Sequence, residues 1–262
     1  MLFSLGARRP SDRDAAVRLL VLKQLVIYGI VTPTMETVEA MGASWSQTDR
    51  RQFERDLEDL RREHWSKVGP WNRSLTPTER AFALATPFTM TERQRIDVSW
   101  RMEAFQVLLW ALALIDEMPG HDTEADLELL KQFPTLDATA FVRSARLRPR
   151  AQIDHARDLA EFWHWRSRTR ELVEQGRPFD TVASSFGSFD EVVRVAAEHG
   201  HENGDLASVS DGDFTVFGKA YRDLSPEEWA TVRSISVERH FALNWLCGYA
   251  PSNRWDETPT DT

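Results

Sequence analysis

The sequence predicts an all-α protein, a compact multi-helix bundle with a tryptophan-rich core and at most a short strand or two. Three observations favour this class. The 262 residues include 42% hydrophobic and 28% charged side chains, a composition typical of globular proteins long enough to bury a core. Serine or threonine residues suited to capping precede most of the apolar or amphipathic stretches. The ten tryptophans fall mainly at helical spacing, where such large rings usually fill a core.

The first half of the chain is expected to form four helices, each opened by a serine or threonine cap. They span residues 11–28, 46–65, 76–85 and 91–115. The first is apolar on nearly every side, as a buried helix is, whereas the second is charged and should lie on the surface. The fourth is the most apolar helix and the expected centre of the core. Pro33 and Gly42 indicate looser structure between the first two.

The second half continues with short outer helices over residues 122–145 and a long amphipathic helix from Pro149 to about Gly176. A glycine-rich stretch follows, with a helix over 189–199 and a short strand at 214–217. Ser225, followed by proline and glutamates, opens the last helix, which should run to Cys247. We expect one helical domain over residues 1–262, with its weakest seam near residues 87–91.

The charge and cysteine content favour a cytoplasmic protein that binds neither nucleic acid nor membrane. The net charge of -9 opposes binding to phosphate backbones. The single cysteine cannot form an internal disulfide, so nothing indicates an oxidising compartment. The longest apolar stretch, residues 105–115, is much shorter than the roughly 20 residues of a membrane span.

Three blocks of residues resemble the domain of unknown function 4272 family, which is found mostly in bacteria. The blocks are Trp100-Arg101-x-Glu103-Ala104 with Leu109-Trp110-Ala111-Leu112, then Asp158-Leu159 with His164-Trp165 and Arg168, and finally Glu238-Arg239-His240-x-Ala242-Leu243-Asn244-Trp245 with Trp255-Asp256 and Asp261-Thr262. The resemblance covers residues 94–262 and leaves 1–90 as a less distinctive helical part. It implies a helical fold and brings no established activity, cofactor or catalytic residue.

The polar residues of these blocks support two hypotheses. In the first, four charged residues pair across two core helices, because a buried charge is tolerated only when it is paired. These four are Arg101, Glu103, Glu238 and Arg239. In the second, Glu103 or Glu238 is a general base and His240 its acid partner, in a cleft floored by Trp100 and Trp245. A concave cavity where these side chains converge would favour the second hypothesis.

Further binding candidates are His164, Arg168, Asn244, Trp255, Asp256 and Asp261. We expect Trp255 to pack into a groove while Asp256 and Asp261 accept hydrogen bonds from arginines such as Arg101, Arg168 or Arg239. Trp71 and Trp255 lie outside strong helices, so they are the better exposed candidates for stacking on a sugar or a base. No metal site is expected, because Glu161-x-x-His164 lacks the second such pair that a di-iron bundle needs. The metal-capable group Glu198-His199-x-His201-Glu202 with Asp205 lies in a glycine-rich stretch, where solvated side chains are usual.

The sequence therefore favours an interaction or small-ligand-binding protein whose polar motifs are mainly structural. Its acidic surface would suit a basic protein partner. The alternative is an enzyme that uses Glu103, Glu238 and His240 in a tryptophan-lined pocket. Neither a phosphate-binding glycine loop nor a serine-hydrolase elbow is present, so the sequence does not support nucleotide hydrolysis or serine-hydrolase chemistry. No cofactor is expected.

Overall fold

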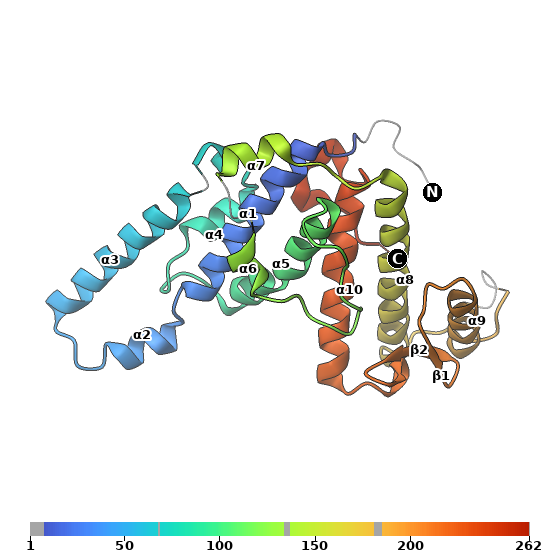
Figure 1. Ribbon diagram of the computed structural model, residues 1–262. Coiled ribbons are helices and arrows are strands. Elements are labelled where there is room, and N and C mark those ends of the chain that lie inside the picture. Colours follow the sequence, from blue (N-terminus) through green and yellow to red (C-terminus); the bar gives the residue numbers. More distant parts are fainter. Residues whose placement is uncertain (1–7, 68, 134–136, 181–184, 262) are drawn as a thin grey trace.

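Ten α-helices and a small three-stranded sheet make up the computed structural model, which describes residues 8–67, 69–133, 137–180 and 185–261 (Figure 1). The helices are α1 (Asp12–Val31), α2 (Met35–Met41), α3 (Gln47–Ser66), α4 (Pro77–Leu84), α5 (Glu92–Ala111), α6 (Leu129–Gln132), α7 (Ala138–Ser144), α8 (Arg150–Glu174), α9 (Phe189–Glu202) and α10 (Pro226–Leu246). The prediction of a mainly helical fold with short strands is confirmed. Four of the ten tryptophans are buried and the others are half-buried.

The core is built on four long helices. α10 packs against both α8 and α5, and α1 packs against α5. Leu19 and Leu22 of α1 and Phe105 and Leu108 of α5 are fully buried. The prediction that the helix beginning at Thr91 lies at the centre of the core is therefore confirmed.

Capping explains where most of these helices begin. The side chain at each cap accepts a hydrogen bond from a backbone N–H one turn on, and the residue there bonds back to the cap. Such reciprocal boxes open α1, α3, α4, α5 and α10, at Ser11, Ser46, Thr76, Thr91 and Ser225. All five starts agree with the sequence prediction.

The structure departs from the predicted helices in several places. α1 continues beyond residue 28 to Val31, and α9 continues beyond residue 199 to Glu202. The segment expected to be loose contains α2, whose Thr34 cap accepts a hydrogen bond from the Thr37 backbone N–H at 3.1 Å. α5 ends at Ala111 instead of Ile115, because Ala113 takes a positive φ of 55°. The Arg148 side chain then donates to the carbonyl oxygens of Trp110 and Ile115, at 2.7 and 2.8 Å, and so satisfies groups that the helix leaves free.

A second, smaller hydrophobic cluster lies where the sheet meets α8, α9 and the first half of α10. The strands β1 (Val209–Ser210), β2 (Asp213–Val216) and β3 (Lys219–Ala220) pair antiparallel in the order β1-β2-β3. β2 agrees with the strand expected at 214–217. Both tight turns use positive φ, with Gly212 at 73° and Gly218 at 74°.

The segment after α10 folds back onto the core in two short 3-10 turns, η3 (Pro251–Asn253) and η4 (Trp255–Glu257). Trp255 is only 2% exposed and its ring lies edge-on against Phe241 and Trp245, with centroids 4.8 and 5.1 Å apart. The expected packing of Trp255 into a groove is confirmed, and the expectation that it is an exposed ring is wrong. Three aromatic rings hold this segment against α10.

α2 and α3 extend away from the body of the molecule, at the end opposite to α9 and the sheet (Figure 1). α3 carries the expected charged surface and buries only His64 and Trp65. Taken over the described residues, no single helix is long and apolar enough to cross a membrane. α1 and α2 meet that test of length and composition only as a pair bent by 43°.

Candidate functional site

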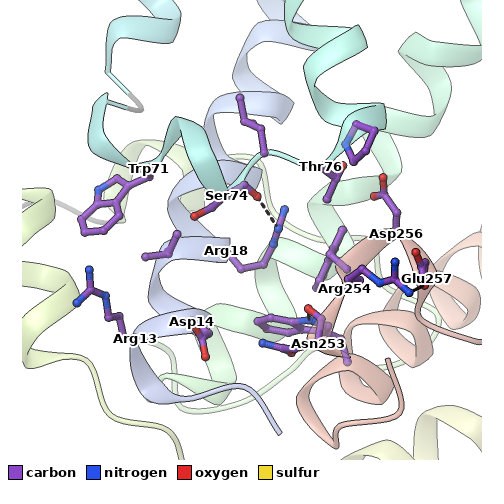
Figure 2. A pocket seen from close by; sticks show the side chains of 15 residues that line it. Arg13, Asp14, Arg18, Trp71, Ser74, Thr76, Asn253, Arg254, Asp256 and Glu257 are labelled. Atoms are coloured by element: carbon purple, nitrogen blue, oxygen red, sulfur yellow. Dashed lines mark hydrogen bonds and ion pairs between the residues drawn. The ribbon is translucent and has the colours of Figure 1, made fainter. Parts of the chain in front are cut away.

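A groove of about 560 Å³ runs between the first half of α1, the turn η1 (Gly69–Ser74) before α4, and the segment after α10. Figure 2 shows Arg13 and Trp71 at one end of this groove, and Arg254, Asp256 and Glu257 at the other. The groove is therefore assembled from parts of the chain that are far apart in sequence.

The floor of the groove is fixed by a buried ion pair. Arg18 Nη1 lies 2.6 Å from Glu79 Oε1, and Arg18 Nη2 donates to the Ser74 carbonyl oxygen at 2.9 Å. The Arg18 guanidinium also lies 5.0 Å from the ring of Trp255. Both charged residues are less than 8% exposed. One arginine thus ties α1 to η1, α4 and the terminal segment, and its role is structural.

A second pocket, of about 330 Å³, shares Trp255 and Asp256 with the groove and is otherwise lined by α4, α5 and α10. Here Arg101 of α5 pairs with Glu238 of α10 at 3.0 Å, and the guanidinium lies 4.6 Å from the ring of Phe241. Burial raises the pKa of Glu238, although Arg101 opposes the shift. The carboxylate is therefore poorly solvated, and a positively charged ligand would stabilise its ionised form.

Glu103 and Arg239 form a different, structural network. Arg239 Nε lies 2.9 Å from Glu103 Oε2, and its remaining donors reach the carbonyl oxygens of Pro119 and Thr123, both at 2.7 Å. The second Glu103 oxygen accepts from the Ala125 backbone N–H at 2.7 Å. The predicted pairing of the four charged residues across α5 and α10 is confirmed. The Glu103–Arg239 pair also anchors the loop after α5.

His240 belongs to a third network, between α8, α10 and the end of the chain. Its Nδ1 lies 3.0 Å from Nδ1 of His164, and its Nε2 lies 2.9 Å from Nδ2 of Asn244. Arg157 donates to the Asn244 side-chain oxygen at 2.8 Å, while Asn244 Nδ2 also donates to the Pro259 carbonyl oxygen. Arg157 thereby fixes the Asn244 amide, which makes His240 an acceptor at Nε2 and the donor to His164 at Nδ1.

The structure does not join Glu103, Glu238 and His240 into one hydrogen-bonded group among the described residues. Glu238 lines a pocket, whereas Glu103 and His240 are held by separate partners. The two tryptophans expected to form the floor of the cleft lie apart from this pocket. Trp245 lines the larger groove, and Trp100 is half-buried on α5.

The arginines expected to bond with Asp256 and Asp261 have other partners. Arg101 pairs with Glu238, Arg239 with Glu103, and Arg168 with Glu171 at 2.6 Å. Asp256 and Asp261 are both exposed. Asp256 has no ion-pair partner in the part of the chain that the structure describes, and it therefore adds a negative charge to the lining of both pockets.

Sequence reasoning missed two buried ion pairs. Arg18 interrupts an apolar helix, which was the available signal for the first pair. The second joins Arg166 of α8 to Asp213 of β2 through two contacts of 2.6 Å, with the guanidinium 4.4 Å from the Tyr221 ring. Asp213 lies in a glycine-rich stretch whose pattern gave no sign of burial.

No group of three or more histidine, cysteine, aspartate or glutamate side chains in the described parts of the chain is arranged to hold a metal ion. Glu161 instead lies 2.6 Å from Arg157, and Glu198 pairs with Arg194 at 3.0 Å. These carboxylates are held by arginines on their own helices.

Comparison with known proteins identifies a family without an assigned function. The model of a domain of unknown function, DUF4272, matches residues 54–184, from within α3 to beyond the end of α8. The match contains the blocks around Trp100 and His164 but not the block at 238–245. No curated protein and no solved structure matches the chain. Because the family model covers half of the sequence, the chain belongs to the DUF4272 family.

Proposed function

We propose that the protein binds a small organic cation in the pocket between α4, α5, α10 and the segment that follows α10. The observation that carries the proposal is the meeting of Arg101, Glu238, Trp255 and Asp256 around one cavity of about 330 Å³. These residues come from three separate parts of the chain. Small-molecule sites are typically cavities of roughly this size with an apolar lining and a few converging polar groups.

The charge of the lining favours a cation. Four carboxylates line the pocket, from Glu79, Asp97, Glu238 and Asp256, against two arginines, Arg93 and Arg101. Arg93 pairs with Asp97 at 2.9 Å and Arg101 with Glu238, while Arg18 neutralises Glu79 from the neighbouring groove. Asp256 has no ion-pair partner among the described residues, and Glu238 is poorly solvated. An ammonium or guanidinium group between these two carboxylates would stabilise both.

The apolar part of the lining favours a ligand with a short hydrocarbon body. Leu25, Phe82, Val98 and Trp255 line the same pocket. Their side chains would cover an alkyl chain or a small ring attached to the cationic group, and the Trp255 ring also attracts cations. We therefore infer a ligand such as an alkylamine, an alkylguanidine or an arylalkylamine.

The proposal is tested by thermal-shift and calorimetric titration with small amines and guanidines, using carboxylates of the same size as matched compounds. We expect the amines to raise the melting temperature at neutral pH and the carboxylates to leave it unchanged, because only a ligand that binds the folded state stabilises it. The Glu238→Gln and Asp256→Asn variants should each weaken binding about tenfold, which is the loss of one charged hydrogen bond.

Glu198→Gln is the matched control, because Glu198 is an exposed carboxylate on α9, outside the pocket. It should bind amines as the wild type does. Equal shifts with amines and carboxylates, or equal losses in all three variants, would show that the pocket does not select a cation.

A further inference from the structure

Unpaired positive charge gathers around a cavity beyond Trp71, at the end of the 560 Å³ groove that lies away from Asp256. A cavity of about 470 Å³ opens there between the start of α1, the turn η1 and α7. It shares only Arg13 and Trp71 with the larger groove, and no residue with the pocket of Glu238. It is therefore a separate site, and an inference about it does not rest on the proposed function.

Three arginines line this cavity, and none of them pairs with a carboxylate of the described residues. They are Arg13, Arg143 and Arg146. Arg143 has no side-chain partner among those residues, and Arg146 donates one nitrogen, Nη1, to the carbonyl oxygens of Arg143 and Ala145. The one carboxylate in the lining, on Asp12, accepts from the Leu147 backbone N–H at 3.1 Å. This pocket is thus positively charged in a protein whose net charge is -9.

The position of Arg13 suits it to bind an anion. Its guanidinium lies over the Trp71 ring, with the central carbon 5.6 Å from the ring centroid. Figure 2 shows the two side chains together at the end of the groove. When a guanidinium stacks on an aromatic ring, the N–H groups at its edge remain free. Two of these N–H groups can donate parallel hydrogen bonds to two oxygens of a phosphate or carboxylate.

We propose that this cavity is a binding site for a small phosphomonoester. A phosphomonoester carries close to two negative charges at neutral pH and presents three strong acceptor oxygens, which fits three arginines opposed by one aspartate. Trp71, Val142 and Ala145 also line the cavity and would cover an apolar group attached to the phosphate. The Thr139 hydroxyl adds a neutral donor to the same lining. A carboxylate, with one charge and two oxygens, would use fewer of these donors.

The test is isothermal titration of the full chain with phenyl phosphate, benzoate and inorganic phosphate in a buffer without phosphate. We expect saturable binding of phenyl phosphate at one site, at least tenfold tighter than benzoate, and weaker binding of inorganic phosphate, which lacks the apolar group. Added salt should weaken the binding, as it does for charge-dominated contacts. Equal affinities for phenyl phosphate and benzoate, or no saturable binding, would overturn the proposal.

The variants Arg13→Gln and Arg143→Gln should each weaken phenyl phosphate binding about tenfold while leaving the melting temperature nearly unchanged, because both side chains are exposed. Arg50→Gln is the matched control. Arg50 is an exposed arginine in the first turn of α3, at the end of the helix that projects furthest from α7 (Figure 1). A loss in Arg50→Gln as large as in the other two variants would show only unspecific attraction and would refute the site. Amine binding should be unaffected by these changes, which separates the failure of this proposal from the failure of the cation site.

Discussion

The Nδ1 atoms of His164 and His240 lie 3.0 Å apart, so one proton must lie between two imidazole rings that come from different helices. His240 is fully buried and donates this proton, since its other ring nitrogen accepts from Asn244. Burial lowers the pKa of His240 to about 3 and that of His164 to about 4. Both rings are therefore neutral at physiological pH, and the pair connects α8 to α10 without a charge.

Acidification should destabilise the protein through this histidine pair. In the unfolded chain a histidine takes up its proton near about pH 6.5. As the pH falls from there toward the folded-state values, the unfolded state binds protons that the folded state does not. The stabilising contribution is then fully present above about pH 6.5 and decreases below it, by on the order of 2 kcal/mol for one histidine at about pH 5.

Urea unfolding at several pH values between neutral and about pH 5 measures this effect. The His164→Gln variant should lose less stability on acidification than the wild type. His155→Gln is the matched control, because His155 is exposed on the same helix. Identical pH dependences for wild type and His164→Gln would contradict the assignment.

Replacing Asp213 by Asn should cost about 3–5 kcal/mol, because it leaves Arg166 as an unpaired buried charge. Asp213 is 0% exposed, and it accepts hydrogen bonds from the Phe214 and Arg222 backbone N–H groups as well as from Arg166. Urea unfolding of Asp213→Asn and of the exposed neighbour Asp211→Asn measures the difference. A loss below about 1 kcal/mol in Asp213→Asn would mean that the pair is not needed to hold the sheet on α8.

The substitution Arg239→Lys should loosen the loop after α5. One ammonium group cannot reach the carboxylate of Glu103 and the carbonyl oxygens of Pro119 and Thr123 from the positions that the guanidinium occupies. We expect faster amide hydrogen exchange over residues 119–125 and a loss of about 2–3 kcal/mol in the free energy of unfolding. Arg254→Lys is the control, because Arg254 pairs with Glu257 in an exposed ion pair. Unchanged exchange in the loop would refute the role given to Arg239.

The substitution Trp255→Ala should cost about 3–5 kcal/mol, because it removes a large buried ring that packs on Phe241 and Trp245. Deleting residues 251–262 should lower the melting temperature by several degrees for the same reason. The deletion should also abolish amine binding, since Trp255 and Asp256 line the proposed pocket. A melting temperature equal to that of the wild type would show that the terminal segment does not stabilise the core.

Local signals explain why the helix starts were predictable. A cap at Ser11 or Ser225 depends on residues within one turn, so a single sequence contains the whole pattern. The end of α5 was not predictable, because no local signal announces the positive φ of Ala113, and Arg148, which bonds the Trp110 carbonyl oxygen there, lies 38 residues away in the sequence. The apolar pattern of the sequence continues past that point and therefore predicts a longer helix.

The same distinction applies to the candidate site. The sequence drew attention to Arg101, Glu238 and Trp255, because polar and aromatic residues stand out in apolar helices. It did not reveal which partners they meet, since Arg101 and Glu238 are 137 residues apart. It also missed the basic cavity, because Arg13 and Arg143 belong to different helices and become neighbours only when α7 packs on α1.

Sequence distance also bears on how the chain reaches this structure. The Arg101–Glu238, Glu103–Arg239 and Asp12–Leu147 bonds close loops of 137, 136 and 135 residues, respectively. Ordering so much chain has an entropic cost that must be met before any of these bonds can form. We therefore expect the Arg101–Glu238 and Glu103–Arg239 bonds to form late in folding, after α5 and α10 have packed. If so, weakening these bonds should raise the unfolding rate and leave the folding rate nearly unchanged.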